Sequence, residues 1–460
     1  MMNNHGRKLT ILMFPWLGHG HISPFLELAK KLSNTNMFTI FLCSTPANLD
    51  FVKKTLKTEG GLCLSSVQLI ELHLPTLPDL PSHLHTTNGL PIHLMPTLKQ
   101  AFDMASQGFS KILKTLMPDL LIYDILQPWA PLAALALGIP SVVFITTSVA
   151  AAINTYHVEC TEENCKDLGR VIACYNNSSS VILVKSFEEI EGKYFDYFSV
   201  LSSKKVVPVG PLVVDQCMDT TQNSVIEWLD RKAVRSTVFV SFGSEYFLSS
   251  DDLEEIAYGL EMSEVNFIWV LRFAKGQKEI NVLEALPLGF VERVKNRGLI
   301  VEEWAPQTRI LAHKNIGGFV SHCGWSSVME AMMFGVPIIA MPMQFDQPVN
   351  ARLVVEVGVG VEVSRDGNGR FKRENVAAFV QNVLVNKLGE SVREKTKNMS
   401  VVLSVKGDKE IDVVVQELLR LCKRGGDDCQ GEEEKEEEDS IDKRAERFIK
   451  KTYEEMRMQG

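Results

Sequence analysis

The sequence predicts an α/β protein with two Rossmann-like domains that face each other across a cleft. Two observations lead to this class. Short apolar runs alternate with amphipathic segments along both halves of the chain, which is the pattern of parallel sheets covered by helices. The chain also has 460 residues, enough for two or three domains. The two domains would bind ligands at the carboxyl ends of their strands.

The first domain is predicted over residues 1–210, and it opens with a strand over residues 9–15. A turn follows at Gly18-His19-Gly20-His21, Pro24 stands where a helix is expected to begin, and a second strand covers residues 37–43. This opening is close to a dinucleotide-binding fingerprint, but Ser23 takes the place of the third glycine and no acidic residue follows the second strand. Both departures disfavour a nicotinamide-dependent oxidoreductase, which is one alternative function.

The remaining elements of the first domain are a polar loop, a helix and four buried strands. They are expected at residues 73–97, about 96–116, 119–124, 141–146, 181–185 and 206–209. Residues 211–223 contain Gly, Pro, Asp and Thr and are predicted to be the interdomain linker.

A second series of strands and helices gives a domain over residues 224–424. Its strands are expected at residues 237–244, 266–272, 299–303 and 317–321, and its helices near residues 251–262, 288–295, 326–334, 373–385, 390–405 and 410–421. Residues 425–460 are predicted to be a disordered acidic linker followed by a short charged helix. That helix resembles a short motif found at the ends of some plant proteins.

Charge and composition exclude several classes of function. The formal net charge is −9, and residues 427–439 alone contain nine acids and one lysine. The rest of the chain is therefore nearly neutral, which gives no electrostatic support for binding nucleic acid. The longest apolar region, residues 128–153, is interrupted by Pro131, Gly138 and Pro140, so no membrane insertion is expected. Nine cysteines without a C-x-x-C pair and a polar start predict reduced thiols and a cytoplasmic protein.

The most informative stretch extends from Trp304 to Gln347. In it, a short apolar strand leads through His322-Cys323-Gly324-Trp325 into a helix that opens at Ser326 and Ser327. A helix that follows a strand directly points its free N–H groups and the positive end of its dipole outward, and phosphate is the usual anion at such a place. Each residue also has a purely structural interpretation. Ser327-x-x-Glu330 fits a capping box, Trp304 a core aromatic and His322 a buried histidine.

Taken together, these positions resemble the donor-binding signature of plant secondary-metabolite UDP-glycosyltransferases, and the resemblance covers roughly residues 8–424. It implies that Trp304 and Gln307 bind uracil, that His322 and Ser327 bind the diphosphate, that Glu330 holds the ribose, and that Trp325, Asp346 and Gln347 face the sugar. Ser326 stands where the family usually has Asn, which predicts a shorter-reaching phosphate contact. The full implied donor set is Thr146, Ser244, Trp304, Ala305, Gln307, His322, Gly324, Trp325, Ser326, Ser327, Glu330, Asp346 and Gln347.

The same resemblance places the catalytic groups in the first domain. His21 matches the family's general base, and a histidine titrates near neutral pH. Asp124 ends a strand of the same sheet and matches the carboxylate that orients that base. His19 matches no motif position and is expected to be structural. An activated hydroxyl that attacks opposite UDP would invert the anomeric carbon. No metal is expected, because the helix dipole and the donor groups would neutralise the phosphates.

The substrates are predicted from finer features of the resemblance. Gln347 matches a residue associated with glucose, so UDP-glucose is the expected donor. The loop with His83, His85, Thr86, Thr87 and Asn88 resembles the branch that adds a sugar to an existing flavonoid or terpenoid glycoside. Two alternatives remain. One is an enzyme that acts directly on aglycones, and the other is a non-catalytic or weakly active sugar-nucleotide binder, because residues 146–186 form a shorter segment than in the family. A monomer is expected.

Overall fold

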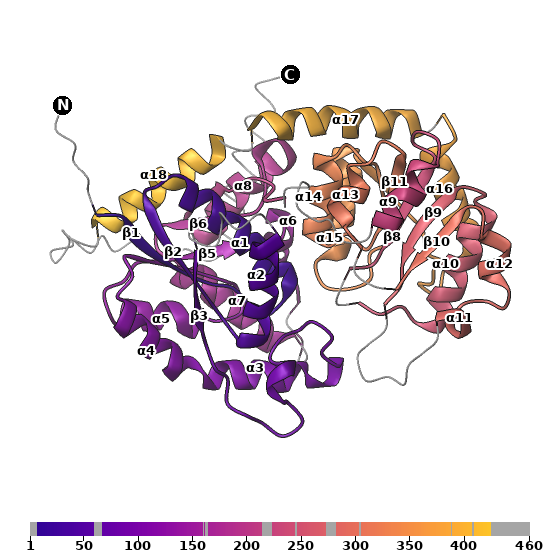
Figure 1. Ribbon diagram of the computed structural model, residues 1–460. Coiled ribbons are helices and arrows are strands. Elements are labelled where there is room, and N and C mark those ends of the chain that lie inside the picture. Colours follow the sequence, from indigo (N-terminus) through magenta and orange to yellow (C-terminus); the bar gives the residue numbers. More distant parts are fainter. Residues whose placement is uncertain are drawn as a thin grey trace, which may run out of the picture.

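The computed structural model describes residues 7–58, 67–159, 161, 164–213, 223–243, 246–272, 282–302, 305–387, 389–406 and 409–424. The predictions for Ser244, Trp304, most of the linker and the tail from residue 425 onward lie outside the described residues. Two parallel sheets lie side by side, one in each half of the molecule (Figure 1). Each sheet buries two apolar clusters, which shows that helices cover both of its faces. The predicted class of two Rossmann-like α/β domains is therefore confirmed.

The first sheet has the strand order β3-β2-β1-β4-β5-β6-β7. Its order reverses between β1 and β4, and in open α/β sheets such a switch point is where ligands bind. Phe14 of β1 pairs with Tyr123 of β4, so the residues that follow these two strands begin next to each other. The strands are β1 Leu9–Phe14, β2 Phe38–Ser44, β3 Val67–Glu71, β4 Leu120–Tyr123, β5 Ser141–Ile145, β6 Val181–Val184 and β7 Lys205–Pro208.

Two helical predictions for the first domain were wrong in detail. The first helix begins at His19 and not near Pro24, so His21 lies on its first turn. The helix predicted near residues 96–116 is two helices that meet at Ala105. The helices are α1 His19–Asn34, α2 Pro46–Thr58, η2 Ser82–Leu84, η3 Ile92–Leu94, α3 Met95–Met104, α4 Ser106–Leu116, α5 Trp129–Leu135, α6 Val149–His157, α7 Cys165–Asn177 and α8 Glu188–Ser202.

The second sheet has the order β10-β9-β8-β11-β12-β13, and its switch point lies between β8 and β11. Its strands are β8 Thr237–Ser241, β9 Asn266–Val270, β10 Gly298–Val301, β11 Ile316–Ser321, β12 Ile338–Ala340 and β13 Gly360–Glu362. The helices of this half are α9 Asn223–Asp230, α10 Ser250–Met262, α11 Val282–Ala285, α12 Phe290–Val294, α13 Gln307–Leu311, α14 Trp325–Met333, α15 Gln347–Val357, α16 Arg373–Leu384 and α17 Gly389–Lys406.

The last described helix, α18 Lys409–Arg424, corrects the predicted domain boundary. The sequence assigned residues 224–424 to the second domain, but α18 lies over the first domain (Figure 1). Its apolar side chains join the cluster formed by β1, β2 and α1: Ile411, Val414, Val415, Leu418 and Leu421. The chain therefore crosses between the domains twice, once through the linker and once between α17 and α18.

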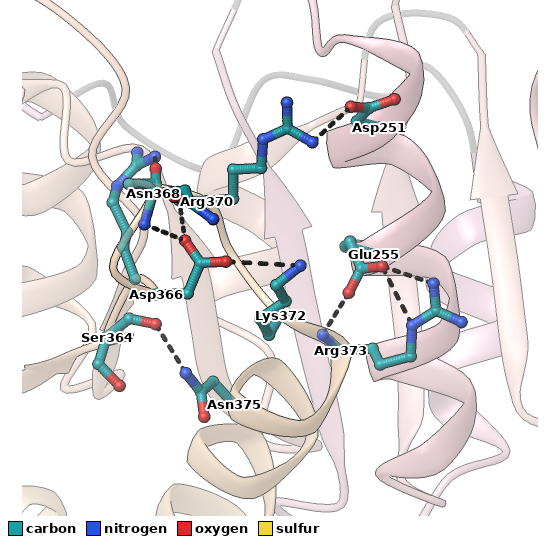
Figure 2. A network of polar contacts seen from close by, with 11 residues as sticks. Asp251, Glu255, Ser364, Asp366, Asn368, Arg370, Lys372, Arg373 and Asn375 are labelled. Atoms are coloured by element: carbon teal, nitrogen blue, oxygen red, sulfur yellow. Dashed lines mark hydrogen bonds and ion pairs between the residues drawn. The ribbon is translucent and has the colours of Figure 1, made fainter.

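A polar network stiffens the second domain on the face of α10 (Figure 2). Asp366 accepts hydrogen bonds from the N–H groups of Asn368 and Arg370, each over 2.9 Å, which closes the loop before α16. Arg373, at the start of α16, donates from two guanidinium nitrogens to Glu255 Oε1 of α10, and its main-chain N–H donates to Oε2. The Arg373 guanidinium lowers the pKa of the Glu255 carboxyl. These contacts hold α16 against α10, behind the sheet that carries the donor motif.

Among the described cysteines, all but one follow the predicted redox state. Cys165 is disulfide-bonded, so the prediction of reduced thiols is wrong at this position. Cys43, Cys174, Cys323 and Cys422 are free. A separate finding concerns membranes: among the described residues, no helix combines the length and the apolar character needed to cross a bilayer.

Candidate active site

His21 and Asp124 meet at the switch point of the first sheet. His21 Nδ1 lies 2.9 Å from Asp124 Oδ2, and the Asp124 side chain is fully buried while 27% of the His21 side chain is exposed. The main chain holds the carboxylate in place, because Trp16 N donates to it over 3.0 Å and Ile125 N over 2.7 Å. With Asp124 at Nδ1, the neutral ring has its proton on that nitrogen, and Nε2 is the nitrogen that can accept another.

Thr146 joins this pair and begins a connection to the second domain. Its Oγ1 lies 3.2 Å from His21 Nδ1. The next residue, Thr147, donates a hydrogen bond to the Asp346 carboxylate, which belongs to the second domain. Ser148 follows and donates to Asn350 Oδ1 over 2.6 Å. Three consecutive residues thus link the His21–Asp124 pair to the loop that carries Asp346.

The N-terminus of α14 is open to an anion. Its N-cap residue, Gly324, has no side chain to accept a hydrogen bond from the first turn, and that turn contains no acidic residue. The capping-box interpretation is therefore wrong. Ser327 is the third residue of the helix, and Glu330 accepts a hydrogen bond from Gln307 Nε2 over 2.7 Å. The N–H groups at this helix end keep their partial positive charge for a ligand.

Gln307, Ser327 and Glu330 form one cluster. Gln307 Nε2 also lies 3.0 Å from Ser327 Oγ, so one amide connects α13 with two successive turns of α14. Burial raises the pKa of the Glu330 carboxyl, while the hydrogen bond from Gln307 and the charge of Lys185 lower it. Ala305, just before α13, is 6% exposed and packs into the core beneath this cluster.

His322 is held between two glycines. A Cβ atom added to Gly243 or to Gly324 would lie 2.8 or 2.7 Å, respectively, from His322 Nε2, closer than real Cβ contacts come. Both positions must therefore remain glycine for the ring to stay where it is. Burial lowers the pKa of His322 to about 4, against the opposing charge of Asp346, so the imidazole is neutral near pH 7. It can take part in hydrogen bonds but brings no positive charge.

Asp346 and Gln347 lie where the second domain approaches Thr147. Asn350 Nδ2 donates to Asp346 Oδ2 over 2.9 Å and to the carbonyl oxygen of Cys323 over 3.0 Å. The side-chain oxygen of Gln347 accepts from the N–H groups of Met343 and Gln344, each over 2.9 Å. These contacts fix both residues, and they leave the NH₂ group of Gln347 as its remaining donor.

The side chain of Trp325 packs between the two domains. The side chain is 3% exposed, and its indole N–H donates to the carbonyl oxygen of Lys185 over 2.5 Å. The indole is therefore a contact between the domains, and only the main chain of Trp325 is left to approach a sugar. Lys185 itself was not predicted, although a lysine directly after a buried strand of the first sheet is a signal that could have indicated it.

Within the described residues, no group of three or more His, Cys, Asp or Glu side chains is arranged to hold a metal ion. Ser244 and Trp304, which complete the predicted donor set, lie outside the described residues. The other predicted donor residues fall into two neighbouring groups, one around Gln307 and Glu330 and one around Asp346. Both border the uncapped end of α14.

Comparison with known proteins agrees with this geometry. Residues 206–409 match the family described as "UDP-glucoronosyl and UDP-glucosyl transferase", and residues 7–175 match "Glycosyltransferase, N-terminal domain". Residues 438–459, beyond the described part, match a family described as "Cotton fibre expressed protein". Mogroside IIIx synthase of Siraitia grosvenorii is 51% identical over 91% of this chain and 94% of its own length. Beta-D-glucosyl crocetin beta-1,6-glucosyltransferase of Gardenia jasminoides is 48% identical over 89% and 98%.

A solved structure has the same fold as this chain. Glycyrrhiza uralensis UGT73P12, crystallised with glycyrrhetinic acid 3-O-monoglucuronide, superposes with a TM-score of 0.80 at 25% identity, covering 91% of this chain and 97% of that chain. Fold and site together define a glycosyltransferase of the GT-B type. The chain belongs to the plant UDP-glycosyltransferase family.

Proposed function

We propose that this enzyme is an inverting glucosyltransferase that uses UDP-glucose, with His21 as general base and Asp124 as its partner. The observation that carries the proposal is the 2.9 Å contact between His21 Nδ1 and Asp124 Oδ2 at the switch point of the first sheet. That contact leaves Nε2 to accept a proton. Thr146 and Thr147 then connect this pair to Asp346, at the sugar end of the proposed donor site.

The reaction is a single displacement. The oxygen of an acceptor hydroxyl attacks the anomeric carbon, and its proton passes to His21 Nε2. The bond between the anomeric carbon and the β-phosphate oxygen breaks, and UDP leaves with that electron pair. Attack from the side opposite UDP inverts the anomeric centre and gives a β-glycoside from an α-linked donor. Asp124 compensates the charge that His21 gains in this step.

The donor is held by the second domain. The N-terminus of α14, with Ser326 and Ser327, binds the diphosphate, and Glu330 with Gln307 binds the nucleoside. Trp304 stacks on uracil and Ser244 adds a phosphate contact, as the family resemblance implies. His322 and Gly324 line the phosphates, and Thr146, Asp346 and Gln347 face the sugar. The helix dipole and the donors around it neutralise the leaving group, so the proposal needs no metal.

UDP-glucose is the proposed donor because the NH₂ group of Gln347 remains available for sugar hydroxyls while its oxygen is occupied by the main chain. Competition among UDP-glucose, UDP-galactose, UDP-xylose and UDP-glucuronate tests this point. We expect glucosylated product to dominate. A higher kcat/KM with another donor overturns the choice of glucose and leaves the transferase mechanism standing.

The proposed acceptor is a sugar hydroxyl of an existing flavonoid or terpenoid glycoside. The Gardenia jasminoides relative, a beta-D-glucosyl crocetin beta-1,6-glucosyltransferase by name, supports acceptors of this kind. The polar loop gives weaker support than its sequence suggested. The hydroxyls of Thr86 and Thr87 donate to the carbonyl oxygen of Leu17, over 3.3 and 3.5 Å, so they hold the loop against the turn before α1. His83, which is exposed, and the half-buried Asn88 remain as candidates for contact with the acceptor sugar.

The deciding experiment compares kcat/KM on an aglycone with kcat/KM on its monoglucoside. Preference for the monoglucoside is expected, because a site that bonds sugar hydroxyls leaves buried polar groups unpaired when those hydroxyls are missing. An equal or higher rate on the aglycone refutes chain extension. Binding of UDP-glucose with no release of UDP, with or without acceptor, supports the non-catalytic alternative. We expect a cytosolic monomer whose partners are these two substrates alone.

A further inference from the structure

Lys185 is a charged side chain that the first domain places against the donor helix. It follows β6 and is 2% exposed. Its Nζ donates to Ser326 Oγ over 2.9 Å, and its carbonyl oxygen accepts from the indole of Trp325 over 2.5 Å. Both partners belong to the first turn of α14. One residue of the first domain therefore contacts the N-terminus of the proposed phosphate-binding helix twice.

The charge of Lys185 lacks a close counter-charge. Among the described residues, no carboxylate lies within ion-pair distance of its ammonium. Burial lowers the pKa of Lys185 to about 8, while the more distant charges of Glu330 on α14 and Glu27 on α1 raise it. The positive end of the α14 dipole also destabilises the protonated form of Lys185. A buried cation beside the positive end of a helix is stabilised when an anion binds there.

The contact also fixes the direction of the Ser326 hydroxyl. An ammonium group can only donate, so Ser326 Oγ must accept from Lys185. The proton of the hydroxyl is then free to point at another acceptor, and the neighbouring charge makes that bond stronger. Ser326 replaces the family's usual Asn, whose amide also donates but reaches further. The pair of Lys185 and Ser326 supplies an oriented donor and a positive charge at the same place.

We propose that Lys185 is a positioning residue for the donor diphosphate, acting through Ser326, so that the first domain takes part in nucleotide binding. The inference rests on the proposed donor site at the N-terminus of α14. When the bond to the anomeric carbon breaks, the β-phosphate oxygen gains negative charge. The buried ammonium group of Lys185 stabilises that negative charge. Lys185 would thus contribute both to the affinity for UDP and to the departure of UDP.

Binding of UDP and of uridine, measured by calorimetry on the full chain, tests the proposal. Lys185→Met should weaken UDP binding roughly 10- to 100-fold, the worth of one hydrogen bond to a charged group. Uridine has no phosphate, so its affinity should be the same in the wild type and in Lys185→Met. Lys193→Met is the matched control. Lys193 pairs with Glu356 across the same domain boundary but does not contact α14, and its removal should leave UDP binding within about twofold.

The pH profile separates the charge from the shape of the side chain. Lys185 is protonated below its pKa, and a bound phosphate favours that form. The contribution of Lys185 to the affinity for UDP-glucose is therefore complete at lower pH and declines as pH rises past about 8. Lys185→Arg keeps its charge throughout this range, so its profile should stay flat between pH 7 and 9. The ionisation of the nucleotide affects both profiles equally, so the difference between the profiles reports on the side chain at position 185.

A double-variant cycle tests whether Lys185 acts through Ser326. If it does, Ser326→Ala combined with Lys185→Met should bind UDP about as weakly as the worse single variant. A wild-type protein that does not bind UDP contradicts the donor site itself. A wild type that binds UDP, with Lys185→Met binding equally well, overturns the role of Lys185. Equal losses of UDP and uridine in Lys185→Met also overturn it, because they indicate a structural effect.

Discussion

His21 Nδ1 and Asp124 Oδ2 are 2.9 Å apart, although the two residues lie 103 positions apart in the sequence. The contact follows from the pairing of β1 with β4, which ends both strands at the same edge of the sheet. The carboxylate cannot turn away, because Trp16 N and Ile125 N both donate to it. The orientation of the proposed base is therefore built into the backbone of the first sheet.

His21→Ala should lower kcat roughly 10²- to 10⁴-fold, the usual contribution of a positioned base. Asp124→Asn should lower kcat by a comparable amount, because it keeps the shape of the side chain but removes the charge that supports a protonated His21. UDP affinity should change little in both variants, since neither His21 nor Asp124 is among the proposed nucleotide contacts. Steady-state transfer rates together with UDP calorimetry measure the two effects.

His19→Ala is the matched control for this prediction. His19 lies on the same helical turn, but its ring stacks on Phe51 at a centroid distance of 4.0 Å. The His19→Ala variant should be less stable than the wild type, and its kcat should stay within a few-fold of the wild-type value. Near-full activity in His21→Ala, or an equal loss of kcat in His19→Ala, would show that the base has been misassigned.

How far the sequence predicted this molecule depends on the range of the interactions. Strands such as β1 and β4 were placed within about a residue, because a buried parallel strand is a continuous apolar run. The strands β3, β12 and β13 were missed. Two of them, Ile338–Ala340 and Gly360–Glu362, have only three residues, too few for a periodic signal. The start of α1 was missed because Gly18-His19-Gly20-His21 has the composition of a turn.

The site divides in the same way. Gln307, Ser327 and Glu330 lie within one continuous stretch, where a family signature fixes their register. Lys185 and Ser326 are 141 positions apart, and Ser148 and Asn350 are 202 apart. Such contacts depend on how one domain sits against the other, which neither periodicity nor a local motif encodes. Lys185, Ser148 and Asn350 were consequently missed, although Ser326 and Asp346, which also take part in contacts between the domains, belong to the predicted donor set.

Gly324→Ala should weaken donor binding, because its Cβ would lie 2.7 Å from His322 Nε2. The ring is already confined on its other side by Gly243, so the clash must displace the turn before α14. Overpacking of this kind typically costs about 1–3 kcal/mol. Calorimetric titration with UDP should show a lower affinity, and thermal unfolding a lower Tm. Gly367→Ala, where an added Cβ meets nothing within 4 Å, should change neither. Wild-type affinity in Gly324→Ala would disprove the steric argument.

Asn350→Leu should destabilise the boundary between the domains. The Asn350 side chain is fully buried, donates to Cys323 O and Asp346 Oδ2, and accepts from Ser148 Oγ. Leucine keeps the volume but removes the hydrogen-bond partner of Cys323 O and of the Ser148 hydroxyl proton, at about 1–3 kcal/mol for each buried group. Urea unfolding should show the loss, and KM for UDP-glucose should rise because Asp346 Oδ2 then keeps Thr147 but loses Asn350 as a donor.

Asn375→Leu controls for the change of residue type. Asn375 makes one hydrogen bond, to the carbonyl oxygen of Ser364 near the surface (Figure 2). Its replacement should cost no more than about 1 kcal/mol and leave KM unchanged. Similar losses in the two variants would indicate that the position of Asn350 between the domains has no special importance.

The last prediction separates the C-terminal tail from the helix that precedes it. A chain that ends at Arg424 should keep its Tm and its activity, because α18 is then complete and its apolar side chains remain in the first domain's core. Val414 and Leu418 are fully buried there, and Lys205 pairs with Glu417 over 2.8 Å. The removed residues include nine acids and one lysine between positions 427 and 439, which would repel a UDP-sugar.

A chain that ends at Lys406 should aggregate or unfold, since each buried side chain lost from the core removes about 1.5–3 kcal/mol. Val414→Asp in the full chain should destabilise in the same direction, which shows that the effect comes from α18 and not from shortening the chain. A clear drop in Tm or in activity for the chain ending at Arg424 would instead show that residues beyond it pack on the enzyme.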